Sequence, residues 1–591
     1  MSKTIYECFW AVTERYPERT ALMYKKDKKY NALTFLELNE MVNEIAAGLQ
    51  SRGISKGDRV AIFSYNRPEW VISDLAILKL GGIVVPIYHT LPPASVKYII
   101  NDAAVKLIFV ETPELMKVIN HIQRETPALQ SIVAFYPITT KVSISFCCFQ
   151  KLREKQERVE TVPTLPDDFA TIVYTSGTTG EPKGVMPTHR NIVSNALVAI
   201  KRFKVDPDDV FVSFLPLCHM FERTAGYYTI LFAGGSIAYA ENLQTILQDV
   251  QTIRPTVLIT VPRVLEKAYY TVAEKVENGS PLKRKIVISV VRTFNNYNLF
   301  KNRKRRIPLS LKLRHYIYGK LVVSKFHQLT GGRLHLIVSG GAPLDKQIGC
   351  LFRNLEFKIV EGYGLTETSP IVSVDTLEND RLGTVGKPLQ GIEVKISEND
   401  EILVRGPNVM KGYLNKPEET AKVIDEDGWF HTGDQGRFDD LGNLVISGRI
   451  KELIVTSYGK NIAPVPIEFE IAKSPYVEQV MLYGDQKPYL TALIVPQKEM
   501  VENYARTHCM NFSTYDELLK KVEIKTLINE EVAKAAVNFA PFEQIKAFTL
   551  ISESFSIEDG TLTPTLKLRR NKIAEKFRQQ IEAMYKLPTT G

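Results

Sequence analysis

Apolar positions in the first hundred residues follow the spacing of helices that alternate with buried strands. The segment LTFLELNEMVNEIAAGLQSRG begins with Thr34 and Glu37 at capping-box spacing and ends at Gly53. Its apolar residues fall on one helical face, at Leu38, Met41, Val42, Ile45 and Leu49. Short β-branched runs at 59–63 and 82–87 flank a further helical pattern, WVISDLAILKLG. This order predicts a βαβ unit.

The same alternation continues along most of the chain. Strand-like runs occur as KLIFV, TVLITV and LHLIVSG, and alternating helices and strands favour an α/β fold with largely parallel sheets. From about residue 383 the pattern changes to short strands and turns, which predicts a small antiparallel β unit. Beyond GRIKELIV at 448–455, strands and helices alternate again.

We therefore expect two domains, since 591 residues exceed what one hydrophobic core supports. The predicted N-terminal domain covers 1–448 and contains parallel-rich α/β subdomains plus the small β unit. The predicted C-terminal domain covers 449–591, is smaller and has an α+β pattern.

Composition indicates the cellular compartment in which the protein is expected. The six cysteines show neither disulfide-framework nor zinc-ligand spacing. The first residues lack the apolar segment of a cleavable secretory signal, and the apolar runs are interrupted well short of a membrane span. We expect a reducing environment and a cytoplasmic protein, either free or peripheral to a membrane.

Basic residues are concentrated in the segment 301–314. The chain has a formal net charge of +9, and this segment carries no acid but seven cations: Lys301, Arg303, Lys304, Arg305, Arg306, Lys312 and Arg314. Two interpretations remain open, a solvated surface and a peripheral contact with an anionic membrane. Pro308 favours a loop-like patch over a continuous amphipathic helix. No nucleic-acid-binding motif accompanies the segment, so we expect no nucleic-acid partner.

The stretch YTSGTTGEPKG at 174–184 follows a strand-like run and precedes a helical pattern at 189–203. Glycine allows a backbone that turns several amide N–H groups inward, and hydroxyl side chains add donors for phosphate oxygens. It is not a Walker A sequence, because Gly184 and Val185 follow Lys183 where that motif needs Ser or Thr. We predict a polyphosphate-binding loop; a flexible surface turn is the alternative.

Two further clusters carry groups that suit a nucleotide. In EGYGLTETSP at 361–370, Tyr363 offers a face for stacking, while Thr366 and Glu367 offer a hydroxyl and a carboxylate suited to Mg²⁺. In WFHTGDQGRF at 429–438, Asp434 is expected on a tight turn, where it could accept two hydrogen bonds from a ribose diol. Each cluster alone could also be a purely structural turn.

Six motifs together resemble a known family. YTSGTTGEPKG, SGGAPL, GYGLTET, HTGD, SGRIKELIV and TPTLKLRR occur in this order. The chain thus resembles the adenylate-forming superfamily of acyl-CoA synthetases, firefly luciferases and peptide-synthetase adenylation domains. PLCHMFERT at 216–224, the basic stretch between about 270 and 330 and the LTPTLKLRR ending resemble its long-chain fatty acyl-CoA synthetase branch.

The resemblance implies a two-step activity. ATP activates a fatty acid, most simply a long-chain one, to acyl-AMP with release of pyrophosphate, and CoA then accepts the acyl group as AMP leaves. The expected substrates are the fatty acid, ATP and CoA, with Mg²⁺ as cofactor. The alternative from the same family is a fatty acyl-AMP ligase that passes the acyl group to a carrier protein. The oligomeric state stays open.

The resemblance also implies residue roles in the first step. Lys567 bridges the carboxylate and the α-phosphate, with Thr366 and Glu367 as further catalytic residues and with Glu367 and Thr175 holding Mg²⁺. Asp434 and Arg449 take the ribose hydroxyls. The remaining ATP or AMP contacts are Thr175, Ser176, Gly177, Thr178, Thr179, Gly180, Lys183, Gly340, Gly341, Ala342, Gly362, Tyr363 and Gly364.

The second step is implied to need rotation of a mobile C-terminal domain about a hinge at 449–453, with Lys451 as the pivot. Gly459 then lines the pantetheine tunnel, although Tyr458 departs from the family pattern, which commonly has a second glycine there. His219 is expected beside the acyl chain, with ordinary packing of a buried histidine as the alternative. Arg223 stands where some bacterial members carry a gating tryptophan, so that style of gate is not predicted.

Overall fold

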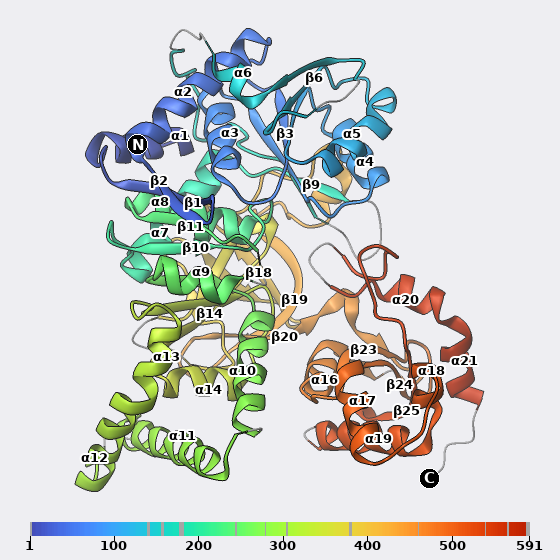
Figure 1. The fold of residues 1–591 in the computed structure, drawn as a ribbon. Helices are drawn as coiled ribbons and strands as arrows, with labels where there is room; N and C mark the ends of the chain where they lie inside the picture. The colour runs from blue at the N-terminus through green and yellow to red at the C-terminus, as the bar shows by residue number, and fades with distance from the viewer. Residues whose placement is uncertain are drawn as a thin grey trace.

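A computed structural model describes residues 3–138, 142–154, 159–175, 182–242, 245–277, 279–302, 305–376, 381–458, 460–537, 539–563 and 567–586. It has a large N-terminal domain, blue to yellow in Figure 1, and a smaller C-terminal domain, orange to red, beside its lower half. This arrangement confirms the predicted fold class. Within these ranges, no helix is both long and apolar enough to cross a membrane.

The first α/β subdomain contains a five-stranded parallel sheet. Its order is β4 (Ile83–Ile87), β3 (Arg59–Phe63), β5 (Leu107–Val110), β6 (Ser131–Ala134) and β7 (Ser145–Cys148). The accompanying helices are α2 (Phe35–Ser51), α3 (Pro68–Lys79), α4 (Pro93–Asp102), α5 (Pro113–Ile122) and α6 (Phe149–Arg153). The predicted βαβ unit is confirmed as β3–α3–β4. Thr34 and Glu37 form the predicted capping box at the start of α2.

The second subdomain contains a nine-stranded mixed sheet. Its order is β16 (Lys387–Pro388), β15 (Ile371–Val374), β14 (Lys358–Gly364), β13 (Leu336–Gly340), β12 (Val257–Thr260), β10 (Val210–Ser213), β11 (Ser236–Tyr239), β1 (Thr20–Lys26) and β2 (Lys29–Thr34). The strands from β14 to β1 run parallel, and antiparallel strands close both edges. Its core includes side chains from α1 (Ile5–Arg15), α7 (His189–Phe203) and α8 (Thr229–Ala233).

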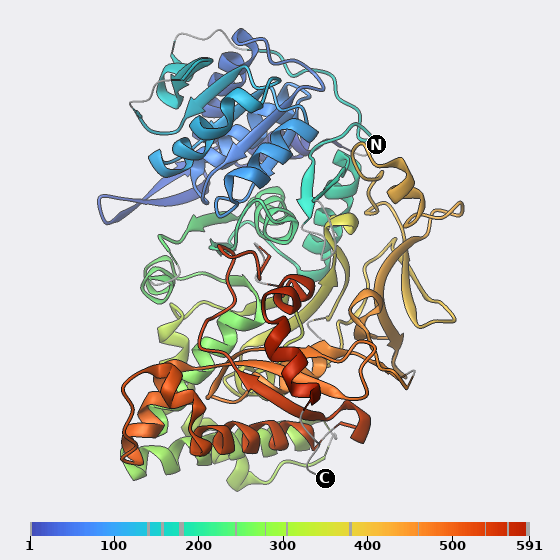
Figure 2. The same ribbon diagram turned by 90° about the vertical axis from the view of Figure 1, so that its right-hand side faces the viewer.

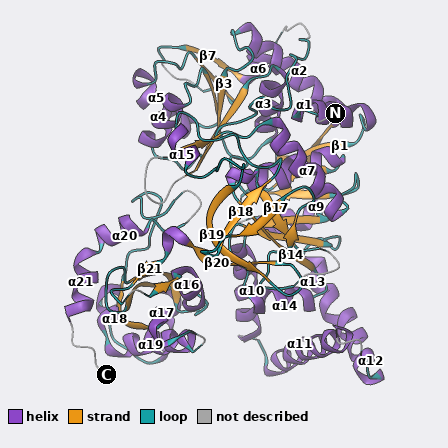
Figure 3. Ribbon diagram, turned by 180° about the vertical axis from the view of Figure 1, so that it is seen from behind, coloured by secondary structure: helices purple, strands orange, loops and turns teal. Residues whose placement is uncertain are grey.

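A helical excursion leaves this sheet between β12 and β13. It comprises α10 (Pro262–Glu277), α11 (Pro281–Asn302), α12 (Leu309–Tyr318), the π-helical turn η3 (Gly319–Val323) and α13 (Ser324–Leu329). Figures 1 and 3 both place α11 and α12 at the end of the molecule opposite the five-stranded sheet. α9 (Ile246–Ile253) precedes β12, and α14 (Lys346–Asn354) follows β13.

The structure corrects the loop-like patch expected over 301–314. Residues 301–302 end α11 and residues 309–314 belong to α12, while 303–304 lie outside the described ranges. Pro308 separates the two helices as predicted, but it does so as the N-cap of α12 with φ −58°. Proline is tolerated at a helix start because the first backbone N–H groups have no partner within the helix.

The predicted antiparallel β unit is present. Its strand order is β17 (Glu393–Ile396), β18 (Glu401–Arg405), β19 (Phe430–Phe438) and β20 (Leu444–Arg449). The short helix α15 (Pro417–Ala421) lies between β18 and β19 in sequence. A separate antiparallel hairpin of β8 (Val173–Thr175) and β9 (Lys183–Val185) flanks the predicted phosphate loop.

The C-terminal domain has its own cores. Its three-stranded sheet is β23 (Val477–Tyr483), β24 (Leu490–Pro496) and β25 (Ile545–Leu550), and a smaller pair is β21 (Ile454–Val455) with β22 (Asn461–Ile462). The C-terminal domain is turned toward the viewer in Figure 2. Its helices are α16 (Pro464–Ile471), α17 (Lys498–Thr507), α18 (Tyr515–Lys520), α19 (Val522–Ala536), α20 (Arg570–Lys576) and α21 (Arg578–Lys586). Across the domains, Lys473 forms an ion pair with the buried Asp345 that caps α14.

Candidate active site

Two of the quoted motifs meet because their strands are neighbours. β13 and β14 pair in parallel with Gly340 opposite Gly362, so SGGAPL and GYGLTET leave the sheet at the same edge. Ligands of open α/β sheets bind at the carboxyl ends of parallel strands. A Cβ on Gly340 would lie 2.8 Å from the Phe221 ring, and one on Gly364 would lie 1.9 Å from the Pro370 oxygen. Position 364 therefore requires glycine, whereas a side chain at 340 would have to displace the Phe221 ring.

Asp434 is the buried centre of a polar triad. The Tyr363 hydroxyl donates a hydrogen bond to Asp434 Oδ2 (2.6 Å), and Arg449 Nε donates to Asp434 Oδ1 (2.6 Å). Burial opposes the charge on Arg449, but the Asp434 carboxylate outweighs it and raises the pKa of Arg449. Three residues predicted to contact the nucleoside, from β14, β19 and β20, thus lie together.

The expectation of a tight turn at Asp434 is wrong. Asp434 lies within β19 and pairs with Arg449 of β20. Gly433 has φ +70°, and the register of β19 shifts against both neighbouring strands near this point. The glycines that suggested a turn instead permit an irregularity inside a paired strand.

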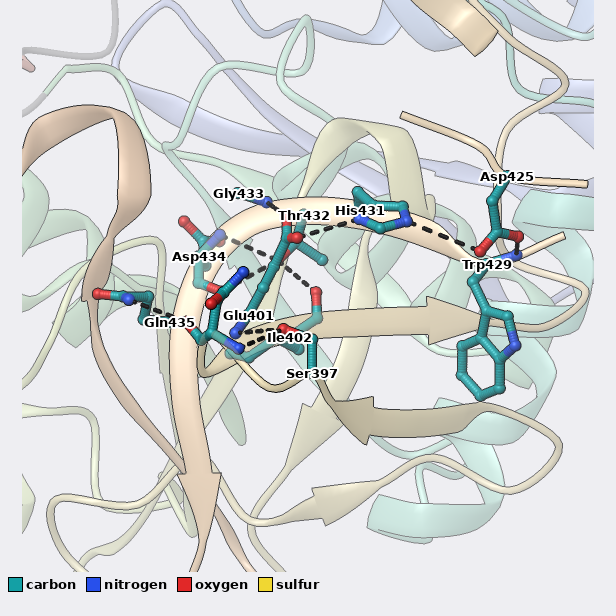
Figure 4. A network of polar contacts seen from close by, with 11 residues as sticks. Ser397, Glu401, Ile402, Asp425, Trp429, His431, Thr432, Gly433, Asp434 and Gln435 are labelled. Carbon is teal, nitrogen blue, oxygen red and sulfur yellow. Dashed lines mark hydrogen bonds and ion pairs between the residues drawn. The ribbon is translucent and has the colours of Figure 1, made fainter. Parts of the chain in front are cut away.

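Glu401 fixes this irregularity and was not anticipated from the sequence. Its Oε1 accepts a hydrogen bond from the Gly433 backbone (2.9 Å), and its Oε2 lies 3.0 Å from His431 Nδ1. The Thr432 hydroxyl donates to the Ile402 carbonyl (2.7 Å) and accepts from the Asp434 backbone (3.0 Å). Figure 4 shows these contacts joining β18 to the HTGD segment. They hold the backbone that presents Asp434.

A second chain of contacts connects Glu367, the predicted magnesium ligand, to the strands that flank the predicted phosphate loop. The Tyr413 hydroxyl donates to Glu367 Oε1 (3.1 Å), and Lys183 Nζ lies 5.0 Å from the centre of the Tyr413 ring. Lys183 also pairs with Glu419 Oε2 (2.5 Å), which lowers the pKa of Glu419 to about 2. Thr175 lies opposite Lys183 in the β8–β9 hairpin. Ser176, Gly177, Thr178, Thr179 and Gly180 lie outside the described residues.

Lys567 of the C-terminal domain reaches this region of the N-terminal domain. Its backbone is fixed by a hydrogen bond from Lys567 N to the Thr563 hydroxyl (3.0 Å). The side chain keeps access to solvent, yet crowding protein atoms, together with Arg449, lower its pKa. The carboxylates of Asp434, Glu452 and Glu367 act in the opposite direction. The lysine therefore lies within electrostatic range of both contact chains described above.

His219 also lies within electrostatic range of Lys567. Desolvation lowers the pKa of His219 to about 4, and the charge of Lys567 adds to that shift. The imidazole is therefore uncharged at neutral pH. The neighbouring Arg223 is fully buried and pairs with Asp74, so it belongs to the core and does not line an opening.

The remaining predicted residues are placed only in part. Gly341 (φ +81°) and Ala342 are exposed just after β13, and Thr366 begins the 3₁₀ turn η4 (Thr366–Thr368) after β14. Lys451 lies in the 3₁₀ turn η5 (Ile450–Glu452), directly after β20. Gly459 lies outside the described residues, and its neighbour Tyr458 is exposed.

Comparison with known families accounts for most of the chain. Residues 9–414 match the model of the AMP-binding enzyme family, and residues 451–588 match that of the AMP-binding enzyme C-terminal domain. The chain belongs to the AMP-binding enzyme family. The resemblance to adenylate-forming enzymes is thereby confirmed.

Similar proteins align with this chain over nearly its whole length. Long-chain-fatty-acid–CoA ligase 5 of Rattus norvegicus is 32% identical, covering 99% of this chain and 89% of the relative. Fatty acyl-CoA synthetase A of Dictyostelium discoideum is 33% identical, covering 96% and 88%. Long-chain-fatty-acid–CoA ligase FadD15 of Mycobacterium tuberculosis is 32% identical, covering 95% and 93%.

Solved structures agree on the fold. The adenylation domain of a carboxylate reductase from Mycobacterium chelonae superimposes with a TM-score of 0.77 at 23% identity, covering 99% of this chain and 91% of that one. The anthranilate CoA ligase AuaEII, in complex with anthranoyl-AMP, gives 0.75 at 18% identity, covering 98% of both chains.

Proposed function

We propose that this protein is a long-chain fatty acid–CoA ligase that forms AMP. The carboxylate oxygen of the acid attacks the α-phosphorus of ATP and pyrophosphate leaves; the CoA thiol then attacks the acyl carbon and AMP leaves. One observation carries the proposal: Lys567 of the C-terminal domain lies within electrostatic range of Asp434, Arg449, Glu367 and His219. Relatives with nearly full-length coverage bear the same name.

The proposed first step brings two anions together, so positive charge must lie between them. Lys567 supplies that charge between the carboxylate and the α-phosphate. Asp434 and Arg449 bind the ribose hydroxyls, and Tyr363 faces adenine beside the backbone at 340–342. The loop from Thr175 to Lys183 surrounds the β- and γ-phosphates, and the neutral His219 borders the acyl chain. The contacts among Tyr363, Asp434 and Arg449 support these roles.

The residues present fit Mg²⁺ as cofactor. Glu367 and Thr175 offer a carboxylate and a hydroxyl, the hard oxygen donors that Mg²⁺ binds, with phosphate oxygens completing its shell. Tyr413 positions the Glu367 carboxylate, and Lys183 connects Tyr413 to the strand that carries Thr175. When bound, the ion neutralises phosphate charge.

Substituting Glu367 by glutamine should raise the Mg²⁺ concentration needed for half-maximal adenylation, by an expected factor on the order of ten, because an amide binds a hard cation less strongly than a carboxylate. Magnesium titrations of pyrophosphate release from both proteins measure this factor. Glu419→Gln is the matched control, since it removes a carboxylate from the same contact chain at a position with no proposed metal role. Coincident titrations for Glu367→Gln and the parent would exclude Glu367 as a ligand.

The acceptor and the acid are tested in one assay. Pyrophosphate release is followed over a panel of carboxylic acids of rising chain length, with and without CoA. The proposal expects turnover with long-chain acids and formation of acyl-CoA. Acyl-AMP that accumulates unchanged in the presence of CoA would favour the carrier-protein ligase instead, and no turnover with any fatty acid would refute the proposed function.

Peripheral membrane contact through 301–314 belongs to this proposal as well, because long-chain acids partition into bilayers. Within the described part of that segment the cations are available to a partner, since Lys301, Arg305, Arg306, Lys312 and Arg314 are all exposed. The exposed apolar residues that would complete a membrane-binding surface lie mainly in α12.

A further inference from the structure

We infer that α12 and the turn η3 form an interfacial membrane anchor that inserts an apolar face between lipid headgroups of an anionic bilayer. This goes beyond electrostatic attraction to the 301–314 segment, because the inserted residues extend to Leu321. The inference concerns attachment of the protein to a membrane surface. It rests on the proposed function only in that such attachment gives a fatty acid ligase access to acids dissolved in the bilayer.

The first observation is an exposed apolar stripe. None of the α12 residues is buried. Leu309, Leu313 and Leu321 are 83%, 60% and 60% exposed, and Tyr316 and Ile317 between them are exposed too. These residues recur at steps of three and four, so they share one side of the helix. A face of this kind in water is unfavourable unless something covers it.

The opposite side of α12 is already occupied. His315 stacks on Tyr297 of α11 with ring centres 3.8 Å apart and lies 4.2 Å from the Phe294 ring. The Tyr318 hydroxyl lies 2.9 Å from the Ser289 hydroxyl of α11. The helix is therefore held in place by its inner side, which leaves the apolar stripe facing outward.

The second observation is the charge around the stripe. At about 100° per residue, Lys312 and Arg314 fall on either side of the leucines, whereas Lys320 falls on the stripe itself, with its ammonium 5.1 Å from the centre of the Tyr316 ring. All three side chains are exposed. An apolar face bordered by cations is the pattern of helices that lie in the membrane interface.

The positive charge extends over the part of the excursion that follows α10. Residues 278–344 contain fourteen Lys and Arg and no Asp or Glu, whereas the entire chain has a net charge of only +9. The rest of the protein is therefore net acidic. Anionic headgroups attract such a segment with about 1 kcal/mol per cation near the surface.

The same positive charge distinguishes between the possible partners of this apolar face. A second copy of the chain packed against α12 would bring two strongly basic surfaces together, which electrostatic complementarity disfavours. An anionic lipid surface satisfies both features at once, because its acyl region takes the leucines and its headgroups take the cations. Figure 1 shows α11 and α12 at one end of the molecule, where a planar surface can reach them.

The test uses the full chain, without ATP or CoA, and phosphatidylcholine vesicles with and without phosphatidylglycerol. Leu309→Ser, Leu313→Ser and Leu321→Ser combined should weaken co-sedimentation with anionic vesicles by at least about tenfold, because the buried apolar area is lost. The matched control combines Leu247→Ser, Val522→Ser and Val537→Ser, which are similarly exposed elsewhere, and should bind as the parent does.

The cations are tested separately. Arg305→Gln, Arg306→Gln, Lys312→Gln and Arg314→Gln combined should abolish the preference for anionic over neutral vesicles and weaken binding by at least about tenfold. Substituting four exposed cations of the C-terminal domain, Lys498, Arg506, Lys572 and Arg578, by Gln is the control and should change binding little.

Insertion has its own readout. With Tyr316→Trp, anionic vesicles should shift the emission of the introduced indole to the blue and brominated acyl chains should quench it; Leu247→Trp is the control. Binding without such quenching, or unaffected by the leucine substitutions, would overturn the inference. A dimer that dissociates on leucine substitution would also overturn it, by identifying a second copy as the occupant. Because no substrate is present, these outcomes are independent of whether the protein activates fatty acids.

Discussion

Replacing Lys567 by alanine should slow acyl-adenylate formation by about 10²–10³-fold, the usual cost of removing one positioned donor from developing negative charge. The expectation follows from its place within electrostatic range of Asp434, Arg449 and Glu367. Thioester formation from supplied acyl-AMP should stay comparatively intact, because the proposed role of Lys567 is confined to the first step. Single-turnover assays of the two half-reactions measure both rates.

Two further variants sharpen this experiment. Lys572→Ala removes an exposed lysine nearby in α20 and should leave both half-reactions unchanged. Lys567→Arg keeps the charge. The pKa of Lys567 lies below the ordinary 10.5, so the adenylation rate of the parent should fall at an alkaline pH lower than 10.5. The rate of the arginine variant should fall only at a higher pH, because arginine keeps its charge. Equal losses in both half-reactions of Lys567→Ala would refute the assignment of Lys567 to the first step.

The sequence was most informative where structure is local. The ends of α2 follow from Thr34, Glu37 and Gly53, and the strands at 59–63 and 83–87 follow from short β-branched runs bounded by turns. Such patterns depend on neighbours within a few residues, which a single sequence displays directly. The α/β class and the antiparallel unit after residue 383 were predicted on the same basis.

The sequence was least informative where distant segments meet. Asp434 looked like a turn residue because glycines surround it, but pairing with β18 and β20 makes the segment a strand. Glu401 lies about thirty positions before the backbone that it holds, and nothing in its local sequence marks it. The proximity of His219 to Lys567 depends on how the two domains are arranged. A family motif could suggest these partners, but periodicity could not.

Replacing Lys451 by proline should have a second large effect, because Lys451 lies between the two domains. In the structure Lys567 lies within electrostatic range of Asp434 and Glu367, and Asp345 pairs with Lys473 across the domains. We propose that CoA transfer requires the C-terminal domain to rotate away about 449–453. Lys451→Pro fixes one φ angle within η5 and removes a backbone donor there. Adenylation should survive, whereas acyl-CoA formation should fall by on the order of a hundredfold or more, since conformational steps of this kind can limit turnover.

Lys451→Ala separates the backbone from the side chain, because it leaves φ free and should retain both half-reactions. Single-turnover pyrophosphate release measures the first step, and conversion of supplied acyl-AMP to acyl-CoA measures the second. Lys473→Gln should act in the opposite direction to proline: loss of the ion pair with Asp345 weakens the arrangement seen here, so it should slow adenylation relative to thioester formation. A proline variant with unimpaired thioester formation would show that the domains pivot at another position, and the boundary near 449 would then need to be moved.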